Sequence, residues 1–375
     1  EPAPLPPPSA PTTGPILDFP PAEPPADLPA RTADIASAIS TPGRVAELEA
    51  AAAPLDAELW QQLAKAGLLG LEQSGDGLSV VDTVAVATEL GHHLARVPFG
   101  PHAVVAGPVI EEFGSDDLRS TFAGIADGSV IVTVAAEEDP RSRPLTATTG
   151  PALTLSGTKV NVPYASAANL LLVTATGPDG EFAAVIDTTA DGVTITDTPA
   201  TGLTPTAQVD VDGVVVDPTR VLRAGAVDAI TARLRLAVAA DQSGTVTEAL
   251  RLTAEYACQR EQFGRPIGTF QAVSQRLADC YIDAQALNVT TAQAAWLLAH
   301  HDPAAPAAVA TAKFWAAEAG HRIAHACVHI HGGVGLDTSH PVHRYFLRAK
   351  QNEFTAGSAP AILLDIGEAL ASEPA

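Results

Sequence analysis

The spacing of the hydrophobic residues changes twice along this chain of 375 residues, and these changes limit the folds that it can adopt. From Arg31 to about Gly128, apolar residues recur every three to five positions, as in amphipathic helices. Between about residues 129 and 222 the period becomes two, which is typical of strands. From about residue 224 the helical pattern returns. Helices, then strands, then helices indicate an α+β fold without alternating units of a parallel sheet.

Local signals refine this outline. Asp82 or Thr83 is expected to cap a helix in the first part, and the Gly-Pro-Asp-Gly run at 177–180 predicts a hairpin in the second. Long Ala-rich helices are predicted over about 225–259, 267–300, 304–331 and 340–370, and four such helices with short loops suggest an antiparallel bundle. We therefore predict a flexible Pro-rich tail (1–32), a helical domain (33–128), a β domain (129–222) and a helix bundle (223–375).

Composition excludes several classes of partner. The formal net charge of −22 argues against nucleic acid or an anionic membrane, because both require a basic surface. No apolar run approaches the roughly 18 residues of a membrane-spanning helix. Cys258, Cys280 and Cys327 are widely spaced and form no disulfide framework, so a cytoplasmic location is expected. His325, His329 and His331 do not share one helical face, so no metal site is expected.

The stretch from Tyr256 to Gln271 joins two predicted helices and holds an Arg, an aromatic residue, a glycine and a Gln in close order. The guanidinium of Arg260 offers the planar pair of donors that a dinucleotide pyrophosphate requires. Phe263 can pack on a cofactor ring, and Gly264 allows a turn. The alternative is a plain helix corner in which Arg260 pairs with a carboxylate.

A second motif surrounds Gly332 and Gly333. Closely spaced glycines expose backbone N–H groups that can hold a phosphate or a ribose. His329, three residues before the glycine pair, can donate a hydrogen bond to the same ligand. The alternative is a helix that simply ends at a glycine.

With the run Arg348–Ser358, these motifs resemble the flavin-dependent acyl-CoA dehydrogenases over about residues 33–370. The resemblance implies an N-terminal helical domain, a middle antiparallel β-barrel domain, a C-terminal four-helix bundle and FAD as the cofactor. It also implies that six residues bind the ADP half of the FAD held by a neighbouring subunit: Arg260, Phe263, Gln271, His329, Gly332 and Gly333. At the position of His329 the family usually has a Gln.

The sequence departs from the family where the flavin ring and the catalytic base are expected. The segment Ala135–Arg143 lacks the usual Thr-Glu-Pro order, and Asn161 and Pro163 stand where the family has a Trp and a hydroxyl residue. Proline offers neither a hydroxyl nor an N–H. The family's two positions for the base, a glutamate, hold Ala356 and Leu234. Glu353, one helical turn before Ala356, is a candidate for a substitute base. The alternative is an exposed or ion-paired helix residue.

With these departures, the chain resembles the non-catalytic subunit of actinobacterial heterotetrameric acyl-CoA dehydrogenases. Some of these enzymes oxidise CoA thioesters of steroid side chains. The resemblance implies an α2β2 assembly in which a sister subunit supplies the base and most of the acyl-CoA site, and an electron-transfer acceptor that reoxidises the flavin. Three alternatives remain: a homotetramer that uses Glu353, a structural or regulatory partner without flavin, and a flavin monooxygenase of similar fold, which the altered flavin segments disfavour.

Overall fold

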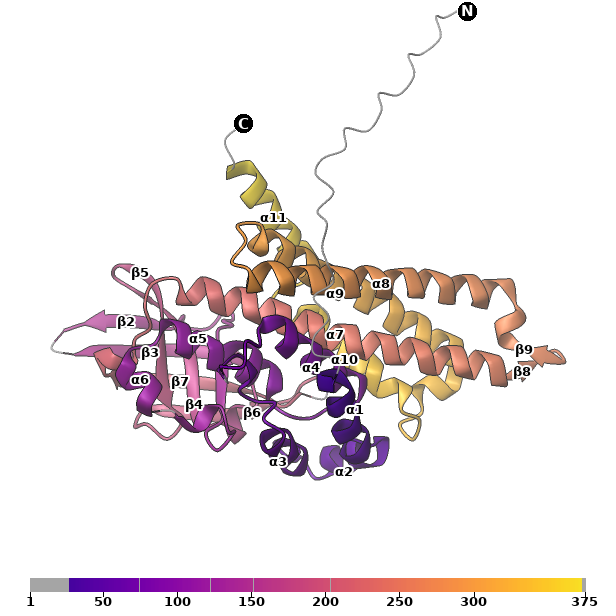
Figure 1. Cartoon of the computed structure of the whole chain (residues 1–375), viewed down its shortest axis with the longest axis horizontal. Coiled ribbons are helices and arrows are strands. Elements are labelled where there is room, and N and C mark those ends of the chain that lie inside the picture. Colours follow the sequence, from indigo (N-terminus) through magenta and orange to yellow (C-terminus); the bar gives the residue numbers. More distant parts are fainter. Residues whose placement is uncertain (1–26, 74, 122, 151, 203, 373–375) are drawn as a thin grey trace, which may run out of the picture.

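The computed structural model describes residues 27–372 except residues 74, 122, 151 and 203. Figure 1 shows short helices in indigo and purple, a sheet in magenta, and long helices from salmon to yellow that run along the molecule. The first helix begins inside the segment predicted as a tail over 1–32, of which residues 1–26 lie outside the described part. The N-terminal elements are α1 (Asp27–Ile39), α2 (Pro42–Ala50), α3 (Ala57–Lys65), η1 (Leu71–Gln73), α4 (Val80–His92), η2 (Gly100–Ala106), α5 (Gly107–Phe113), α6 (Asp116–Thr121) and η3 (Ala123–Ile125).

The cap of α4 differs from the prediction. The Ser79 side chain accepts a hydrogen bond from the N–H of Val81, and the carboxylate of Asp82 accepts one from the N–H of Ser79 at 2.8 Å. Ser79 is therefore the N-cap, and Asp82 is its partner in a capping box. Asp82 and Thr83, the two predicted caps, lie within the helix.

The β domain contains one seven-stranded sheet. Its strands are β1 (Val132–Ala135), β2 (Thr146–Thr149), β3 (Leu153–Pro163), β4 (Leu170–Gly177), β5 (Gly180–Asp187), β6 (Val193–Thr198) and β7 (Thr206–Val216). The order is β1-β4-β2-β3-β7-β6, with β5 paired to β4 through the predicted hairpin. The middle domain was expected to be an antiparallel β-barrel, and most of its strand pairs are antiparallel, but β4 runs parallel to β1 and to the first residue of β2. A parallel pair needs a long connection, and the chain between β1 and β4 provides one.

Strand β4 explains why the sheet and the helices form one unit. Leu170 and Leu172 belong to a large core shared with the N-terminal and C-terminal helices, whereas Leu171 and Val173 belong to a second core inside the β domain. Successive side chains of a strand point to opposite faces, so a strand buried on both faces reads as a continuous apolar run.

The C-terminal part is helical. Its elements are η5 (Pro218–Arg220), α7 (Ala226–Gln259), β8 (Glu261–Gln262), β9 (Arg265–Pro266), η6 (Ile267–Thr269), α8 (Gln271–Ala299), α9 (Ala305–His331), η7 (Gly332–Leu336), α10 (Val342–Phe354) and α11 (Ala359–Ser372). The helix predicted over 340–370 is divided, because Ala356 (φ 57°) and Gly357 (φ 112°) have left-handed backbone conformations that an α-helix cannot contain. Within the described residues, no helix is long and apolar enough to cross a membrane.

Helices α4 and α7 approach closely. A Cβ atom on Gly244 of α7 would lie 2.0 Å from the carbonyl oxygen of Thr88 in α4. Only glycine permits this contact, which fixes the N-terminal helices against the bundle. The first cavity described below is lined by Ala87 and Leu90 of α4 and by Asp241 of α7, which lie near this contact in the sequence.

Candidate functional site

A cavity of about 500 Å³ lies where α4, α7, α10 and the end of β3 meet. Its walls are largely apolar, and Leu234 of α7 is one of them. Thr355, which precedes Ala356, lines the same cavity, as do Asn161 and Pro163. The fold therefore brings Leu234 and Ala356, where the resemblance places a base, close to the altered β-domain segment, although these residues are far apart in the sequence.

Glu137 connects these segments. One oxygen of its carboxylate accepts a hydrogen bond from the backbone N–H of Ala356 at 2.9 Å, and the other accepts one from Nδ2 of Asn161 at 3.0 Å. Asn161 has a left-handed backbone (φ 53°) at an irregularity in the pairing of β3 with β7. We call Glu137, Asn161 and Ala356 the carboxylate clasp. The sequence marked the segment Ala135–Arg143 as altered but gave no sign that Glu137 has these partners.

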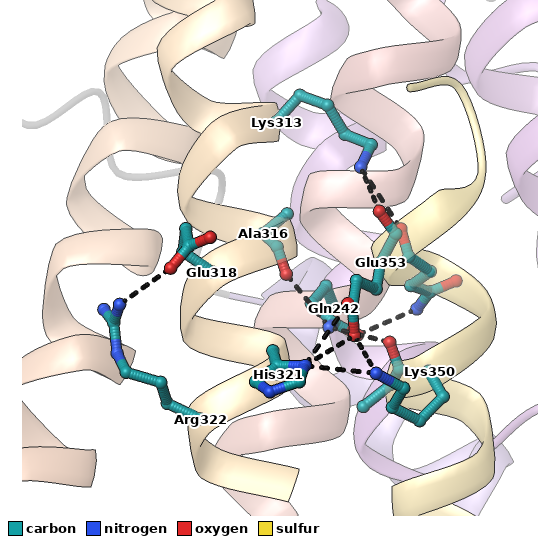
Figure 2. Close-up of polar contacts among 10 residues, drawn as sticks. Gln242, Lys313, Ala316, Glu318, His321, Arg322, Lys350 and Glu353 are labelled. Atoms are coloured by element: carbon teal, nitrogen blue, oxygen red, sulfur yellow. Dashed lines mark hydrogen bonds and ion pairs between the residues drawn. The ribbon is translucent and has the colours of Figure 1, made fainter. Parts of the chain in front are cut away.

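Glu353 faces away from the cavity. Its carboxylate lies 3.2 Å from Nδ1 of His321 on α9 and forms an ion pair with Lys350, as Figure 2 shows. Glu353 is not among the residues that line the cavity, whereas Lys350 is. The side chain of Glu353 thus has the ion-paired position that was the alternative to a role as base.

A buried lysine supports the end of α10. Nζ of Lys313 donates hydrogen bonds to the main-chain oxygens of Asn352 and Glu353, both at 3.2 Å (Figure 2). Its side chain is fully buried, and this burial, with the nearby charge of Arg235, lowers the pKa of Lys313 to about 8. The ammonium group thus provides hydrogen-bond donors for two carbonyl groups that have no donor within the helix, because they lie at the end of α10 just before the break at Ala356.

A polar network, which the sequence did not reveal, holds α7 to α10. The guanidinium of Arg348 forms two 2.8 Å hydrogen bonds with the carboxylate of Asp241. Asn352 donates to Asp241 and also, at 3.1 Å, to the side-chain oxygen of the buried Gln242. A bidentate pair of this kind is rigid, so it fixes the wall of the cavity.

The predicted dinucleotide motif lies at the far end of α7 and α8, where β8 and β9 form a small hairpin that projects from the molecule (Figure 1). Phe263 and Gly264 form its tip with φ values of 56° and 77°, as a two-residue turn requires. Phe263 is 93% exposed. The side chains of Arg260 and Gln271 are also exposed, and Arg260 forms no side-chain hydrogen bond or ion pair with the described residues. The carboxylate partner considered for Arg260 is therefore not found within the described part.

The glycine motif lies at the same end of the bundle. The rings of Tyr256 near the end of α7 and His331 at the end of α9 stack with their centres 4.3 Å apart. Gly332, Gly333 and His329 are exposed beside this stack. The fold thus brings the two motifs together. Within the described ranges, no group of three His, Cys, Asp or Glu side chains is placed to hold a metal ion.

Comparison with known proteins identifies the family. A model of the acyl-CoA dehydrogenase N-terminal domain matches residues 32–128, and one of the C-terminal domain matches residues 226–371. The chain is 42% identical to acyl-CoA dehydrogenase FadE27 of Mycobacterium tuberculosis, over 96% of this chain and 100% of that protein. It is 32% identical to FadE28 of the same organism, over 78% and 86%.

Solved structures agree. The ChsE4-ChsE5 complex from Mycobacterium tuberculosis contains a chain that is 42% identical, with a TM-score of 0.89 and coverage of 93% of this chain and 98% of that one. A variant of the Tcur3481-Tcur3483 steroid ACAD is 38% identical, with a TM-score of 0.87 and coverage of 92% and 97%. A glutaryl-CoA dehydrogenase from Mycobacterium smegmatis, solved with FADH2, shares the fold at 20% identity, with a TM-score of 0.82 and coverage of 93% and 95%. The protein described here belongs to the acyl-CoA dehydrogenase family, whose members bind FAD.

Proposed function

We propose that this chain is the non-catalytic subunit of a heteromeric, FAD-dependent acyl-CoA dehydrogenase. A sister subunit supplies the carboxylate base, the flavin-ring pocket and most of the acyl-CoA site, in an α2β2 assembly with one FAD per pair. Bound FAD would supply the acceptor for the β-hydride of the acyl-CoA, and a carboxylate of the sister subunit would take the α-proton. The chain described here binds the ADP half of that FAD.

The observation that carries this proposal is the contrast between the two ends of α7. At the cavity, the two base positions hold Leu234 and Ala356, and neither side chain can accept a proton. Pro163 has no donor to offer a flavin ring, and the carboxylate of Glu137 already occupies the N–H of Ala356. These residues do not fit the ring half of a flavin.

At the other end of the bundle, the residues present fit an anionic ligand that a second chain would bring. Arg260 keeps its guanidinium exposed and without a carboxylate partner among the described residues. Phe263 holds a left-handed backbone, which is strained for a bulky side chain, and presents its ring to solvent. An exposed aromatic beside an exposed guanidinium is typical of a binding surface.

Two related structures support the assembly and the substrate class. The ChsE4-ChsE5 structure is a complex of two named proteins, and the Tcur3481-Tcur3483 structure is described as a steroid ACAD. By this similarity we propose that the substrate is an acyl-CoA, with a CoA thioester of a steroid side chain as the preferred candidate.

The test is the FAD content and mass of the chain produced alone and together with an acyl-CoA dehydrogenase of the same organism that carries the catalytic Glu. We expect the chain alone to hold no stoichiometric FAD, and the mixed complex to hold one FAD per pair and to reduce an acceptor dye with acyl-CoA. One FAD per chain in a homotetramer with turnover would overturn the proposal. A mixed complex whose flavin is unaffected by changes in this chain would instead indicate a purely structural partner.

A further inference from the structure

A second cavity, of about 420 Å³, adjoins the first and has no role in the proposed function. Tyr164 lies in the wall of both cavities. Arg96 lines the second cavity but not the first, which is largely apolar. The two cavities share the residues Tyr164, Pro199, Ala200, Thr204 and Thr206.

Arg96 is a buried cation to which none of the described carboxylates is bonded. Its side chain is only 9% exposed, and Nε and Nη2 both donate to one acceptor, the main-chain oxygen of Ala53, at 3.2 and 2.9 Å. Nη1 has no hydrogen-bond partner among the described residues. Burial lowers the pKa of Arg96, but an arginine stays charged at neutral pH. Buried charges are normally paired, so this one favours an anion from outside the chain.

Tyr164 supplies a second donor at the same wall. It is 3% exposed and has a left-handed backbone (φ 53°). Its hydroxyl lies near the guanidinium groups of Arg96 and Arg348 and is close enough to Arg348 to interact with it, but it forms a hydrogen bond of regular distance and angle with no described residue. Burial raises the pKa of the Tyr164 phenol, so the group is a neutral O–H donor. Buried hydroxyl groups almost always have partners, and an orphaned one beside a cavity indicates a ligand atom.

The other charges around the second cavity are accounted for. Glu49 forms a 2.9 Å ion pair with Arg344 and favours the charged form of Arg96 from nearby without bonding to it. Arg348, in the wall of the first cavity, forms its bidentate pair with Asp241. Asp197, bonded to the hydroxyl of Ser166, is exposed to water. Among the described side chains around this cavity, the guanidinium of Arg96 is therefore a buried charge to which no carboxylate is bonded.

We propose that this chain binds the carboxylate of an apolar acid between Arg96 and the hydroxyl of Tyr164, with the hydrocarbon body of the acid in the 500 Å³ cavity. Hydrogen bonds from a guanidinium and a phenol to a carboxylate are charge-assisted and strong. A cavity with apolar walls and a few converging polar groups is the usual form of a small-molecule site. The site performs no chemistry, in agreement with Leu234 and Ala356 in its neighbourhood, and it does not involve FAD.

The test uses the assembled complex and two probes with the same hydrocarbon chain, dodecanoate and 1-dodecanol, below their aggregation limits. Binding is measured by isothermal titration calorimetry for the wild type, Tyr164→Phe and Arg96→Gln. We expect Tyr164→Phe to weaken the binding of dodecanoate by about tenfold or more and to leave that of dodecanol unchanged. Arg96→Gln should abolish the preference for the acid over the alcohol.

Tyr164→Phe keeps the test decisive, because its hydroxyl forms no regular hydrogen bond in the described part, and Arg348 beside it keeps its bidentate pair with Asp241, so the loss of the hydroxyl should weaken the fold little. Tyr281→Phe, a change at an exposed tyrosine on α8, is the matched control and should bind as the wild type does. Any acid bound by the sister subunit is the same in all variants, so the difference between them reports this site. Equal affinity of wild type and Tyr164→Phe for dodecanoate, or equal affinity of the wild type for acid and alcohol, would overturn the proposal.

Discussion

The carboxylate of Glu137 accepts a hydrogen bond from the N–H of Ala356 at 2.9 Å across 219 residues of sequence. This bond joins the β domain to the break between α10 and α11. With the Asn161 amide on its other oxygen, the carboxylate is held in place from two domains. The clasp therefore fixes the loop at which the family's base is expected.

The first prediction concerns this clasp. Glu137→Ala should lower the free energy of unfolding by about 1–2 kcal/mol, because it leaves the Ala356 N–H without its acceptor. Glu137→Gln should lower it less, since an amide oxygen still accepts. Urea unfolding of the purified chain or complex measures both, with Glu111→Ala at an exposed site of α5 as control. Equal losses for Ala and Gln would show that the hydrogen bond to Ala356 has no energetic role.

A second prediction tests the exposed end of the bundle. Arg260→Ala should weaken FAD retention by the mixed complex by about tenfold or more, because charge-assisted bonds to a pyrophosphate are strong. The melting temperature of the chain should not change, since the guanidinium is exposed. Equilibrium dialysis with FAD measures the effect, and Arg31→Ala on α1 is the control at another exposed arginine. Unchanged retention would remove Arg260 from the cofactor site.

A third prediction addresses Glu353. Glu353→Gln should leave the turnover of the mixed complex within a few-fold of wild type, because the carboxylate is bonded to His321 and Lys350 and does not line the cavity. Dye reduction with acyl-CoA measures this. Loss of turnover with intact FAD content would instead establish Glu353 as the base.

A fourth prediction is that a glutamate introduced at position 356 is not sufficient to give this chain its own FAD site or activity. Ala356→Glu should produce neither a second FAD per pair nor added turnover, because Asn161 and Pro163 remain at the cavity. The new carboxylate would also lie close to that of Glu137 and repel it. Ala356→Gln, which has the same size without the charge, separates repulsion from crowding. A second equivalent of FAD in the glutamate variant would contradict the proposed division of labour.

A fifth prediction follows from Lys313, whose pKa is lowered to about 8 in the folded chain from 10.5. Below pH 8 the lysine is charged in both states, so folding includes the full penalty of burying a charge. Between pH 8 and 10.5 the unfolded chain binds more protons than the folded chain, so this group makes stability rise with pH. The rise is on the order of 3 kcal/mol.

The measurement is the free energy of unfolding between pH 7 and 10.5 for wild type and Lys313→Met. The variant should lack the rise that Lys313 contributes, and the difference between the two curves removes the titration of other groups. Parallel curves would mean that Lys313 titrates normally. Lys65→Met, at the end of α3, is the control.

Much of the fold could be predicted from local pattern. The helix predicted over 225–259 is α7 (Ala226–Gln259), and the turn predicted at 177–180 joins β4 to β5. The division of the last helix was missed because Ala356 gives no local sign of a left-handed backbone. The parallel pairing of β1 with β4 was missed because strand pairing depends on distant partners.

The candidate site also has a part that the sequence could predict and a part that it could not. The exposed motif of Arg260 and Phe263 was recognisable because its residues are close in sequence. The clasp of Glu137 with Ala356 and the orphan donors at Arg96 and Tyr164 depend on contacts between domains. Their residue types are ordinary, so only the three-dimensional arrangement reveals them.

The hairpin tip has a consequence for gene dosage. A copy of this chain without its proposed partner presents the ring of Phe263, 93% exposed, to water and to any protein it meets. Exposed aromatic rings promote aggregation and recognition by chaperones and proteases. A cell that makes the two subunits in unequal amounts would therefore lose the excess of this one to degradation. Expression of both subunits from one operon would keep their amounts equal and avoid this loss.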